Sequence, residues 1–474
     1  MRPIAESMDA LRAIAESKPV ATLAQAFEAA GHEFALVGGP VRDALLGRSV
    51  KDLDFTTSAR PDETRAILEQ LTDSIWDVGR DFGTIAARVH GESVEITTYR
   101  ADSYQSDSRK PSVQFGDTIE ADLVRRDFTI NALALLLPKL QLVDVSAGVE
   151  DLLAGRIDTP TEPEISFTDD PLRMLRAARF SAQLGFEVAA RVKLAMAEYA
   201  DRLDIISAER VRDELVKLLE TDNPVPGVRL LVDTRLAERF LPELTELLDT
   251  QDDHGRHKDV YEHSLIVLQQ VIELEGARQH EPSPDLVLRL AALLHDIGKP
   301  ATRRFERGGV TFHHHDVVGA KLAKKRLREL RFDNDTVKRV AKLIELHLRF
   351  FGYSDQPWSD SAVRRYVRDA GDELQRLHML TRADVTTRNR RKADRLAHAY
   401  DDIEQRIAEL SEAEQLAAVR PELDGEAIMR ILQIGPGPVV GRAYKYLLEV
   451  RLDEGTIGEA AVTERLKNWF EAQQ

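Results

Sequence analysis

The sequence predicts an α+β protein in which a small head with a mixed β-sheet precedes a long, all-helical remainder. Two observations lead to this prediction. Short and alternating apolar runs typical of strands are confined to the first 150 residues, whereas helical periodicity rich in Ala, Leu, Arg and Glu runs from Asp169 nearly to the end. At 474 residues the chain is long enough for about three domains.

The head elements can be assigned in order, because strand-like and helix-like periods alternate between glycine-containing turns. Gly38-Gly39 stands where the first strand gives way to a helix. The predicted elements are one helix over 1–32, a strand over 33–37, a helix through Leu46, a strand over 52–57 and a hairpin of 84–89 with 94–98. Together they predict a sheet of four or five strands within residues 1–150.

The helical remainder is interrupted by proline and glycine, which end helices. The breaks include Asn223-Pro224, His254-Gly255, Pro357 and the run Gly435-Pro436-Gly437-Pro438. We expect three further regions, over 151–250, 251–405 and 406–474.

Composition excludes several classes of protein. The absence of cysteine rules out disulfides, thiolate metal sites and a cysteine nucleophile. The chain has no apolar run of about 18 residues and no signal-like N-terminus, so we expect a cytoplasmic protein without membrane contact. The net charge of −16 argues against indiscriminate nucleic-acid binding but allows a local basic track.

Three carboxylates form the first candidate site. On a strand, Asp52 and Asp54 point to one face, because side chains alternate with a period of two. Two carboxylates so close favour a divalent cation between them, and Mg²⁺ there could stabilise the attacking and leaving oxygens in a displacement at phosphorus. Glu95 on the hairpin is a third candidate. The alternative is an acidic strand edge without a metal.

Basic residues near these acids suit a nucleoside triphosphate. Gly38 and Gly39 would let backbone amides approach phosphates, and Arg42 offers a guanidinium fork. Farther on, Arg125-Arg126 and Asn131 surround a predicted helix start, where Arg126 and Asn131 suit triphosphate and ribose contacts.

A second basic segment carries arginine at every third position, which brings successive guanidinium groups together along one helix. These residues are Arg173, Arg176 and Arg179. Asp170 could accept a hydrogen bond from an exocyclic amine while Arg173 donates to a ring nitrogen, a pairing that selects cytosine and adenine over uracil and guanine. The alternative is a salt-bridged helix face.

A second candidate site contains histidine and aspartate. His295-Asp296 follows the apolar stretch 290–294, and both residue types bind divalent metals. The further candidate ligands are His263, His315, His347 and Asp384. His280, His378 and His398 are expected to be ordinary hydrogen-bonded core or surface residues.

The ordered head motifs resemble those of bacterial CCA-adding tRNA nucleotidyltransferases, in the class that shares its head with poly(A) polymerases within the DNA polymerase beta superfamily. The resemblance rests on residues 38–54, 95–100, 104–111, 125–132 and 170–179. It implies nucleotide binding by Gly39, Arg42 and Arg126, and magnesium binding by Asp52 and Asp54. It also implies base selection by Asp170, Arg173, Arg176 and Arg179, with a flexible loop over 101–116 that favours complete CCA addition.

The histidine-aspartate set resembles the HD phosphohydrolase superfamily. The resemblance implies that His263, His295, Asp296 and Asp384 hold one metal, with His315 and His347 as candidates for a second. It also implies a possible phosphohydrolase activity on phosphorylated RNA ends, such as a 2′,3′-cyclic phosphate.

The resemblance gives the four regions distinct expected roles. Residues 1–150 would be the nucleotidyltransferase head, 151–250 a neck with the base-selecting helix and an RNA-binding region, 251–405 the HD domain and 406–474 a tRNA-binding tail. The expected substrates are tRNA, CTP and ATP. Two rivals stay open: a poly(A) polymerase, and an HD phosphohydrolase whose head only binds RNA.

Overall fold

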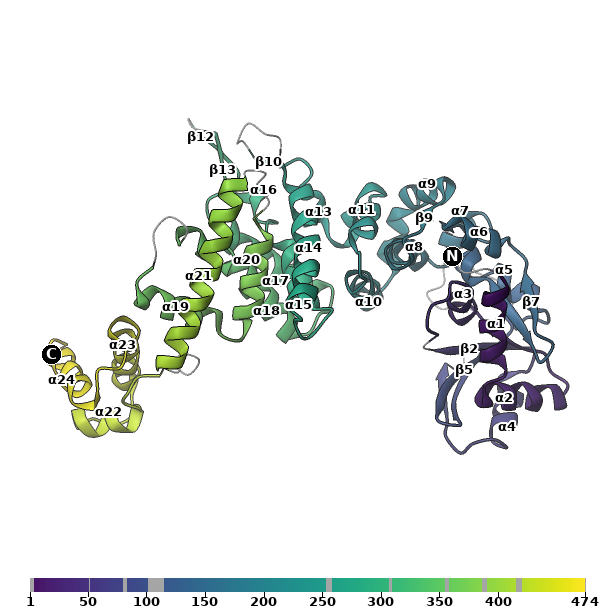
Figure 1. The fold of residues 1–474 in the computed structure, drawn as a ribbon, viewed down its shortest axis with the longest axis horizontal. Coiled ribbons are helices and arrows are strands. Elements are labelled where there is room, and N and C mark those ends of the chain that lie inside the picture. Colours follow the sequence, from purple (N-terminus) through teal and green to yellow (C-terminus); the bar gives the residue numbers. More distant parts are fainter. Residues whose placement is uncertain are drawn as a thin grey trace. The chain divides into compact units, whose positions relative to one another are not determined.

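A computed structural model describes residues 4–50, 52–79, 83–100, 115–252, 258–306, 309–353, 358–385, 390–414 and 420–473 (Figure 1). The chain divides into two compact units, Met1–Pro242 and Glu243–Gln474. The expected α+β class is confirmed, with the main sheet in the first unit. The division into four regions stays a prediction.

The head of the first unit contains a seven-stranded mixed sheet in the order β3-β4-β5-β2-β1-β6-β7. Strands β2 and β5 pair in parallel, and the other neighbours pair antiparallel. The strands are β1 (Phe34–Val37), β2 (Leu53–Thr57), β3 (Ile75–Gly79), β4 (Thr84–Val89), β5 (Glu92–Thr98), β6 (Leu133–Leu137) and β7 (Gln141–Asp144).

The sheet has seven strands, more than the four or five predicted. The prediction missed β3, β6 and β7 because their sequences carry weak periodic signals. The sequence of β6 is a continuous apolar run, as expected for a strand that is largely buried, and it lacks the alternation that identifies a half-exposed strand. Strand β1 lies between β2 and β6 and is fully buried. Phe34 on β1 stacks between Phe27 and Phe55, with ring centroids 4.5 and 4.7 Å apart.

The predicted single helix over 1–32 is wrong. The structure has two helices, α1 (Ile4–Ala15) and α2 (Lys18–Ala29). Ser17 precedes α2, and Pro19 lies in its first turn, where proline starts a helix but cannot continue one from the preceding turn. The other head helices are α3 (Gly39–Leu45), α4 (Pro61–Leu68), α5 (Ile119–Val124) and α6 (Gly148–Ala154).

The rest of the first unit is helical. Its longest helix is α8 (Leu172–Leu184), which packs against α10 and α11. The remaining helices are α7 (Pro163–Asp169), α9 (Ala190–Glu198), α10 (Ala208–Leu219), α11 (Val225–Asp233) and α12 (Ala237–Phe240), with a two-stranded pair of β8 (Arg156–Ile157) and β9 (Glu187–Val188).

The second unit begins with a helical core. Helix α14 packs on α15 and α20, and α17 packs on α18. Two short antiparallel strand pairs interrupt the region expected to be all helical. They are β10 (Gln251–Asp252) with β11 (Lys258–Asp259), and β12 (Arg304–Glu306) with β13 (Gly309–Thr311). The core helices are α14 (Val260–Ala277), α15 (Leu286–Leu294), α16 (Lys299–Thr302), α17 (His315–Glu329), α18 (Asn334–Leu346), α19 (Asp360–Ala370), α20 (Leu374–Ala383) and α21 (Arg390–Glu414).

The tail forms a small core of its own from α22 (Gly425–Leu432), α23 (Pro438–Glu454) and α24 (Glu459–Glu471). Leu423, Ile428, Leu447 and Leu466 are buried at its centre. The Gly-Pro run separates α22 from α23, as expected. In the part of the chain that the structure describes, we find no helix long and apolar enough to cross a bilayer.

Candidate active site and metal centre

The first turn of the site connects β1 to α3. Gly38 has a φ of 77°, a conformation that favours glycine. A Cβ atom there would lie 3.4 Å from Nη1 of Arg126 and 3.8 Å from the carbonyl oxygen of Asn131. The glycine therefore lets the Arg126 guanidinium, which is still partly exposed, pack against the turn. Gly39 follows as the first residue of α3.

The head carboxylates lie on neighbouring parallel strands. Asp54 on β2 pairs in register with Glu95 on β5, so the two side chains share one face of the sheet. Asp52 lies exposed just before β2. Burial, Glu95 and Asp52 raise the pKa of Asp54 to about 6, although Arg126 opposes this. A cation would relieve this repulsion, so the three acids fit a divalent metal.

A hydrogen-bonded chain connects three of the sequence motifs. Nη1 of Arg42 donates to Oδ1 of Asn131 over 2.6 Å, and Nδ2 of Asn131 donates to Asp127 over 3.0 Å. Nε of Arg176 on α8 donates to the same carboxylate over 2.7 Å. Burial alone would raise the pKa of Asp127, but Arg176 and Asn131 lower it to about 2. Arg42 is itself buried, so its predicted contact with phosphate stays a prediction.

Three arginines, one from α3 and two from α8, lie around the ring of Phe180. The guanidinium carbons of Arg42, Arg176 and Arg179 lie 5.2, 5.4 and 4.1 Å from the centroid of Phe180. Nε of Arg179 also donates to Glu214 on α10 over 2.6 Å. Cation–π contacts and this buried acceptor hold the positive charges close together.

The two predicted base-selecting side chains have separate protein partners. Asp170 accepts a hydrogen bond over 3.2 Å from Nη2 of Arg210 on α10. Arg173 donates from Nη1 to Oγ of Ser166 over 2.9 Å and from Nη2 to the carbonyl of Arg125 over 2.6 Å. Arg125 caps the end of α5, and residues 129–131 form one 3₁₀ turn, so the helix predicted to start here is wrong.

The second unit gathers all six predicted histidine and aspartate ligands. They form two groups whose nitrogen and oxygen atoms lie within 4.8 Å of one another. The groups are His263, His295 and Asp384, and Asp296, His315 and His347. Among the described residues, the head carboxylates do not form so compact a group.

Asp296 connects the two groups through its two oxygens. Oδ2 lies 3.3 Å from Nε2 of His295, and Oδ1 lies 3.3 Å from Nε2 of His315. The resemblance assigned Asp296 to the first metal, whereas this geometry favours a shared ligand. Nζ of Lys299 also donates to Oδ2 over 2.7 Å. Sequence reasoning missed Lys299, although it lies one helical turn after Asp296.

Three of the histidines share one backbone arrangement. Nδ1 of His295, His315 and His347 lies 2.8, 2.8 and 2.6 Å from a carbonyl oxygen three residues earlier. An Nδ1–H that donates to this carbonyl leaves Nε2 to bind a metal. His295 and His347 directly follow α15 and α18, where the last carbonyls of each helix need donors.

The pKa values of the clustered histidines and aspartates are shifted in directions that favour a bound cation. Burial opposes protonation of His295, but Asp296 and Asp384 raise its pKa to about 10. Burial and the neighbouring His295 lower the pKa of His347 to about 4. Burial would raise the pKa of the Asp296 and Asp384 carboxyls, yet the neighbouring positive charges hold the pKa of each well below its usual range. A metal would replace the proton on His295 as the counter-charge.

Close packing holds the two metal-ligand segments together. A Cβ on Gly298 would lie 2.1 Å from the carbonyl oxygen of His315 and 2.6 Å from the amide nitrogen of Gly319. Only glycine therefore allows the turn after His295-Asp296 to touch the start of α17.

Several residues that organise the head escaped sequence reasoning. Asp127, Phe180, Arg210 and Glu214 each contact a predicted site residue. Asp127 directly follows the predicted Arg125-Arg126 pair, so the sequence alone could have indicated it, but no local signal pairs α8 with α10. Of the loop expected over 101–116, residues 101–114 lie outside the described residues.

Three family models match the chain along its length. The Poly A polymerase head domain matches residues 34–158, the "Probable RNA and SrmB- binding site of polymerase A" matches 185–248, and the HD domain matches 260–389. The first model contains the carboxylates and Arg126, and the third contains both metal-ligand groups.

Two known proteins are similar over about nine-tenths of the chain, and a third is similar over less than half of it. The CC-adding tRNA nucleotidyltransferase of Thermus thermophilus is 33% identical over 89% of this chain and 90% of its own. The A-adding tRNA nucleotidyltransferase of Deinococcus radiodurans is 34% identical over 90% and 93%. The CCA-adding enzyme of Lactobacillus helveticus is 42% identical over 45% of this chain and 53% of its own.

The fold is also known from solved structures. The CCA-adding enzyme of Bacillus stearothermophilus in complex with CTP superimposes with a TM-score of 0.64 over 100% of this chain and 99% of its own, at 23% identity. Because two relatives above 30% identity span nine-tenths of both chains, the chain belongs to the tRNA nucleotidyltransferase family.

Proposed function

We propose that this protein adds CCA to the 3′ end of tRNA, with CTP and ATP as substrates and without a nucleic-acid template. The observation that supports this most strongly is the in-register pair of Asp54 and Glu95 beside the Arg126-packed glycine turn. Nearly full-length tRNA nucleotidyltransferase relatives provide independent support. With these substrates, the protein would act in the cytoplasm.

The family depends on a divalent metal, and we propose Mg²⁺ held by Asp52 and Asp54, with Glu95 beside them. The bound metal would neutralise charge on the triphosphate and favour attack by the tRNA 3′-hydroxyl at the α-phosphorus, with pyrophosphate as the leaving group. We propose that Arg126 contacts phosphate, because it lies at the glycine turn and is partly exposed. Asp127 would keep Asn131 and Arg176 oriented.

Base selection would use Asp170 and Arg173. Asp170 has a partly exposed carboxylate held by Arg210, and it would accept a hydrogen bond from the exocyclic amine of cytosine or adenine. Arg173 is anchored by Ser166 and the Arg125 carbonyl, and it would donate one of its remaining N–H groups to the ring. Uracil and guanine present a carbonyl where these two bases carry an amine.

Partial addition is the second candidate for the head, because the nearly full-length relatives are a CC-adding and an A-adding enzyme. Complete addition is supported by the 42% identity to a CCA-adding enzyme, a match that covers 45% of this chain. Poly(A) synthesis requires ATP alone, whereas the proposed pairing at Asp170 accepts two bases.

Substitution of Asp52, a proposed metal ligand, tests the proposed nucleotide-addition site in the head. Asp52→Ala should lower the kcat of nucleotide incorporation by about 1,000-fold, because charge stabilisation in the transition state is lost. Binding of tRNA, measured by filter retention, should stay within about twofold of wild type. Full incorporation by this variant would contradict the assigned metal site.

A phosphohydrolase activity of the HD domain is the second function we propose. It is supported by the two compact ligand groups joined through Asp296. A bound metal pair there would activate water for attack on a phosphoester, such as a 2′,3′-cyclic phosphate on RNA. Lys299, next to Asp296, could neutralise charge on the phosphate.

Metal content and hydrolysis test this second site together. His295→Ala should lower the metal bound per chain, measured by atomic emission, and abolish hydrolysis of a 2′,3′-cyclic phosphate while CCA addition continues. Replacement of His314, which lies next to His315 but belongs to neither ligand group, is the matched control. Undiminished hydrolysis in His295→Ala would contradict the assignment.

A further inference from the structure

Helix α5 carries a buried carboxylate that none of the functions described above uses. Asp122 has a side chain with no exposed surface and lies four residues before Arg126. Burial would raise the pKa of Asp122, yet the charges of Arg126 and Arg125 hold it below its usual value, so the carboxylate is ionised. A charge is costly to bury unless it is paired and hydrogen-bonded, so its partners indicate its role.

One oxygen of Asp122 holds the arginine proposed to contact phosphate. Nη2 of Arg126 donates to Oδ2 over 3.0 Å. Nη1 of the same guanidinium lies at the Gly38 turn, 3.4 Å from the place that a Cβ atom of this glycine would take. The Arg126 side chain is 23% exposed, so part of it stays open to a phosphate. The carboxylate therefore fixes one end of the guanidinium while the other end faces the turn.

The same carboxylate contacts the two strands that bear the proposed metal ligands. Oδ2 lies 3.3 Å from the hydroxyl oxygen of Thr56, which follows Asp54 by two residues on β2. Oδ1 accepts a hydrogen bond over 3.2 Å from the backbone amide of Arg100, just beyond the end of β5, which carries Glu95. Asp122 thus sets the position of the arginine relative to both strands.

An anchor matters here because the metal carboxylates attract the same arginine. Burial and Glu95 raise the pKa of Asp54 to about 6, and the charge of Arg126 opposes this rise. The guanidinium and the Asp54 carboxylate are therefore close enough to interact. Without the opposing charge of Asp122, the arginine would be drawn toward the carboxylates and would compete with a metal for them.

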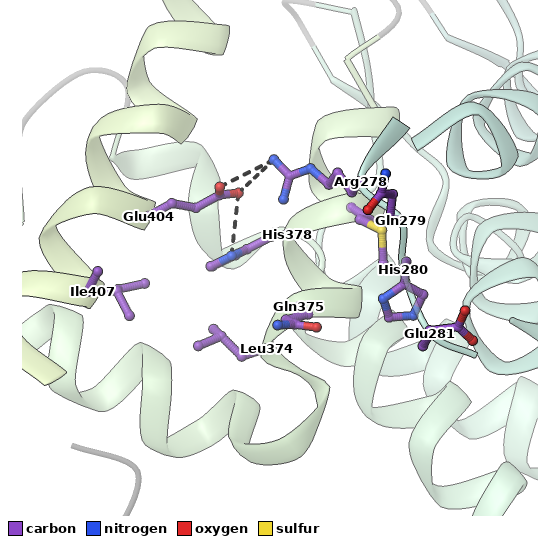
Figure 2. A pocket seen from close by; sticks show the side chains of 11 residues that line it. Arg278, Gln279, His280, Glu281, Leu374, Gln375, His378, Glu404 and Ile407 are labelled. Carbon is purple, nitrogen blue, oxygen red and sulfur yellow. Dashed lines mark hydrogen bonds and ion pairs between the residues drawn. The ribbon is translucent and has the colours of Figure 1, made fainter. Parts of the chain in front are cut away.

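The burial of Asp122 distinguishes it from the acids of more exposed ion pairs. Glu404, at a cavity of about 620 Å³ in the second unit (Figure 2), accepts from Arg278 over 3.2 Å and lies 3.5 Å from Nδ1 of His378, yet its side chain is 27% exposed. Water can replace the partners of such an acid, so these pairs contribute little. Water does not reach Asp122, so removal of its charge leaves Arg126 without a substitute.

We propose that Asp122 is a positioning residue that holds Arg126 toward the nucleotide phosphates and away from the metal carboxylates. This rests on the proposed contact between Arg126 and phosphate. The alternative route is through Arg125, whose Nε lies 3.4 Å from Oδ1 of Asp122 and whose carbonyl accepts from Arg173. An effect through Arg126 changes the affinity for phosphates, whereas an effect through Arg125 changes the contact with the base.

The affinity for phosphates can be measured without catalysis. Equilibrium dialysis of radiolabelled CTP with Mg²⁺ against the full-length protein gives its dissociation constant, and competition by inorganic tripolyphosphate probes the phosphate contacts alone. Asp122→Asn should weaken the binding of both by about tenfold or more, because the charge that fixes Arg126 is lost. Glu120→Gln, which removes an exposed acid of the same helix, is the matched control and should bind both normally.

A double-mutant cycle determines whether Asp122 acts through Arg126. In an Arg126→Ala background, Asp122→Asn should not lower the affinity for tripolyphosphate any further. A general structural defect, or an effect through Arg125, would lower the affinity for CTP in both backgrounds. Such an additive loss, an unchanged affinity for tripolyphosphate in Asp122→Asn, or no saturable binding of CTP by the wild-type protein would each overturn the proposal.

Arg126→Lys decides the question if Asp122→Asn fails to fold, as measured by circular dichroism. A lysine ammonium that pairs with Asp122 has no second end to reach a phosphate, so this variant should bind tripolyphosphate about tenfold more weakly than the wild type. Wild-type affinity in Arg126→Lys would overturn the proposal. A wild-type protein that binds CTP but adds no nucleotide to tRNA would contradict the proposed function, whereas the binding results alone decide the role of Asp122.

Discussion

The titration of the Asp54 carboxyl should make metal binding in the head depend on pH. Folding without metal raises its pKa to about 6 through burial and Glu95, so the folded protein holds this proton more tightly than the unfolded chain does. Metal-free stability should therefore decrease as the pH rises from about 4 to about 6. Mg²⁺ should raise the melting temperature more at pH 7 than at pH 5, because it competes with the proton.

Asp54→Asn provides the control for this prediction, because the amide does not titrate near these pH values. The variant should show no pH-dependent difference in the Mg²⁺ effect, measured by differential scanning fluorimetry. An equal effect of Mg²⁺ at both pH values in the wild-type protein would contradict the assignment of Asp54.

Arg210 should act as a positioning residue for base selection, since it holds the carboxylate of Asp170. Arg210→Ala should raise the KM for both CTP and ATP by about three- to tenfold and change kcat less, because the orientation of the base contact is lost. Arg212→Ala, on the same helix and paired with exposed Asp213, is the matched control. Equal effects of both substitutions on steady-state kinetics would exclude a specific role for Arg210.

At the scale of elements, the strands that position the carboxylates were predictable and the flanking strands were not. Alternation identifies β5, because one face of this strand is less buried than the other. The burial of β2 does not alternate, and the spacing of Asp52, Leu53, Asp54 and Phe55 identified that strand instead. Strand β6 is a uniform apolar run, which fits a buried helix equally well. The sequence spacing therefore located the acidic face but underestimated the width of the sheet.

The contacts between elements were less predictable than the ligands themselves. Adjacent His295 and Asp296 are recognisable as a pair, but the sharing of Asp296 between two ligand groups depends on the approach of α17 to the end of α15. Likewise, the ion pair of Arg179 with Glu214 depends on packing of α8 against α10. Such contacts are set by tertiary structure and leave no periodic signal.

Gly298 should be essential for the packing of the metal-binding elements. Gly298→Ala should lower the free energy of unfolding of the second unit by about 2 to 3 kcal/mol, because its Cβ would collide with the backbone at His315 and Gly319. Gly276→Ala on α14, where a Cβ meets nothing within 4 Å, should be neutral or slightly stabilising. Urea denaturation followed by circular dichroism measures both, and equal stability of the two variants would contradict the packing argument.

At the scale of the whole molecule, the two candidate sites lie in different compact units. Asp52→Ala should therefore strongly lower nucleotide addition and leave metal binding by the HD cluster intact, whereas Asp296→Ala should lower metal binding and leave nucleotide addition intact. Both effects are measurable in one preparation by incorporation assay and atomic emission. A folded variant of either kind that loses both properties would contradict the independence of the sites.

We propose that this chain builds the complete CCA end of tRNA. The most direct test is incubation of end-labelled tRNA lacking its CCA end with Mg²⁺ and CTP, ATP or both, resolved at single-nucleotide length. We predict two additions with CTP alone and three with both nucleotides. Termination after two with both nucleotides, addition only to tRNA that already ends in CC, or a long tail from ATP alone would contradict the claim and indicate a CC-adding enzyme, an A-adding enzyme or a poly(A) polymerase, respectively.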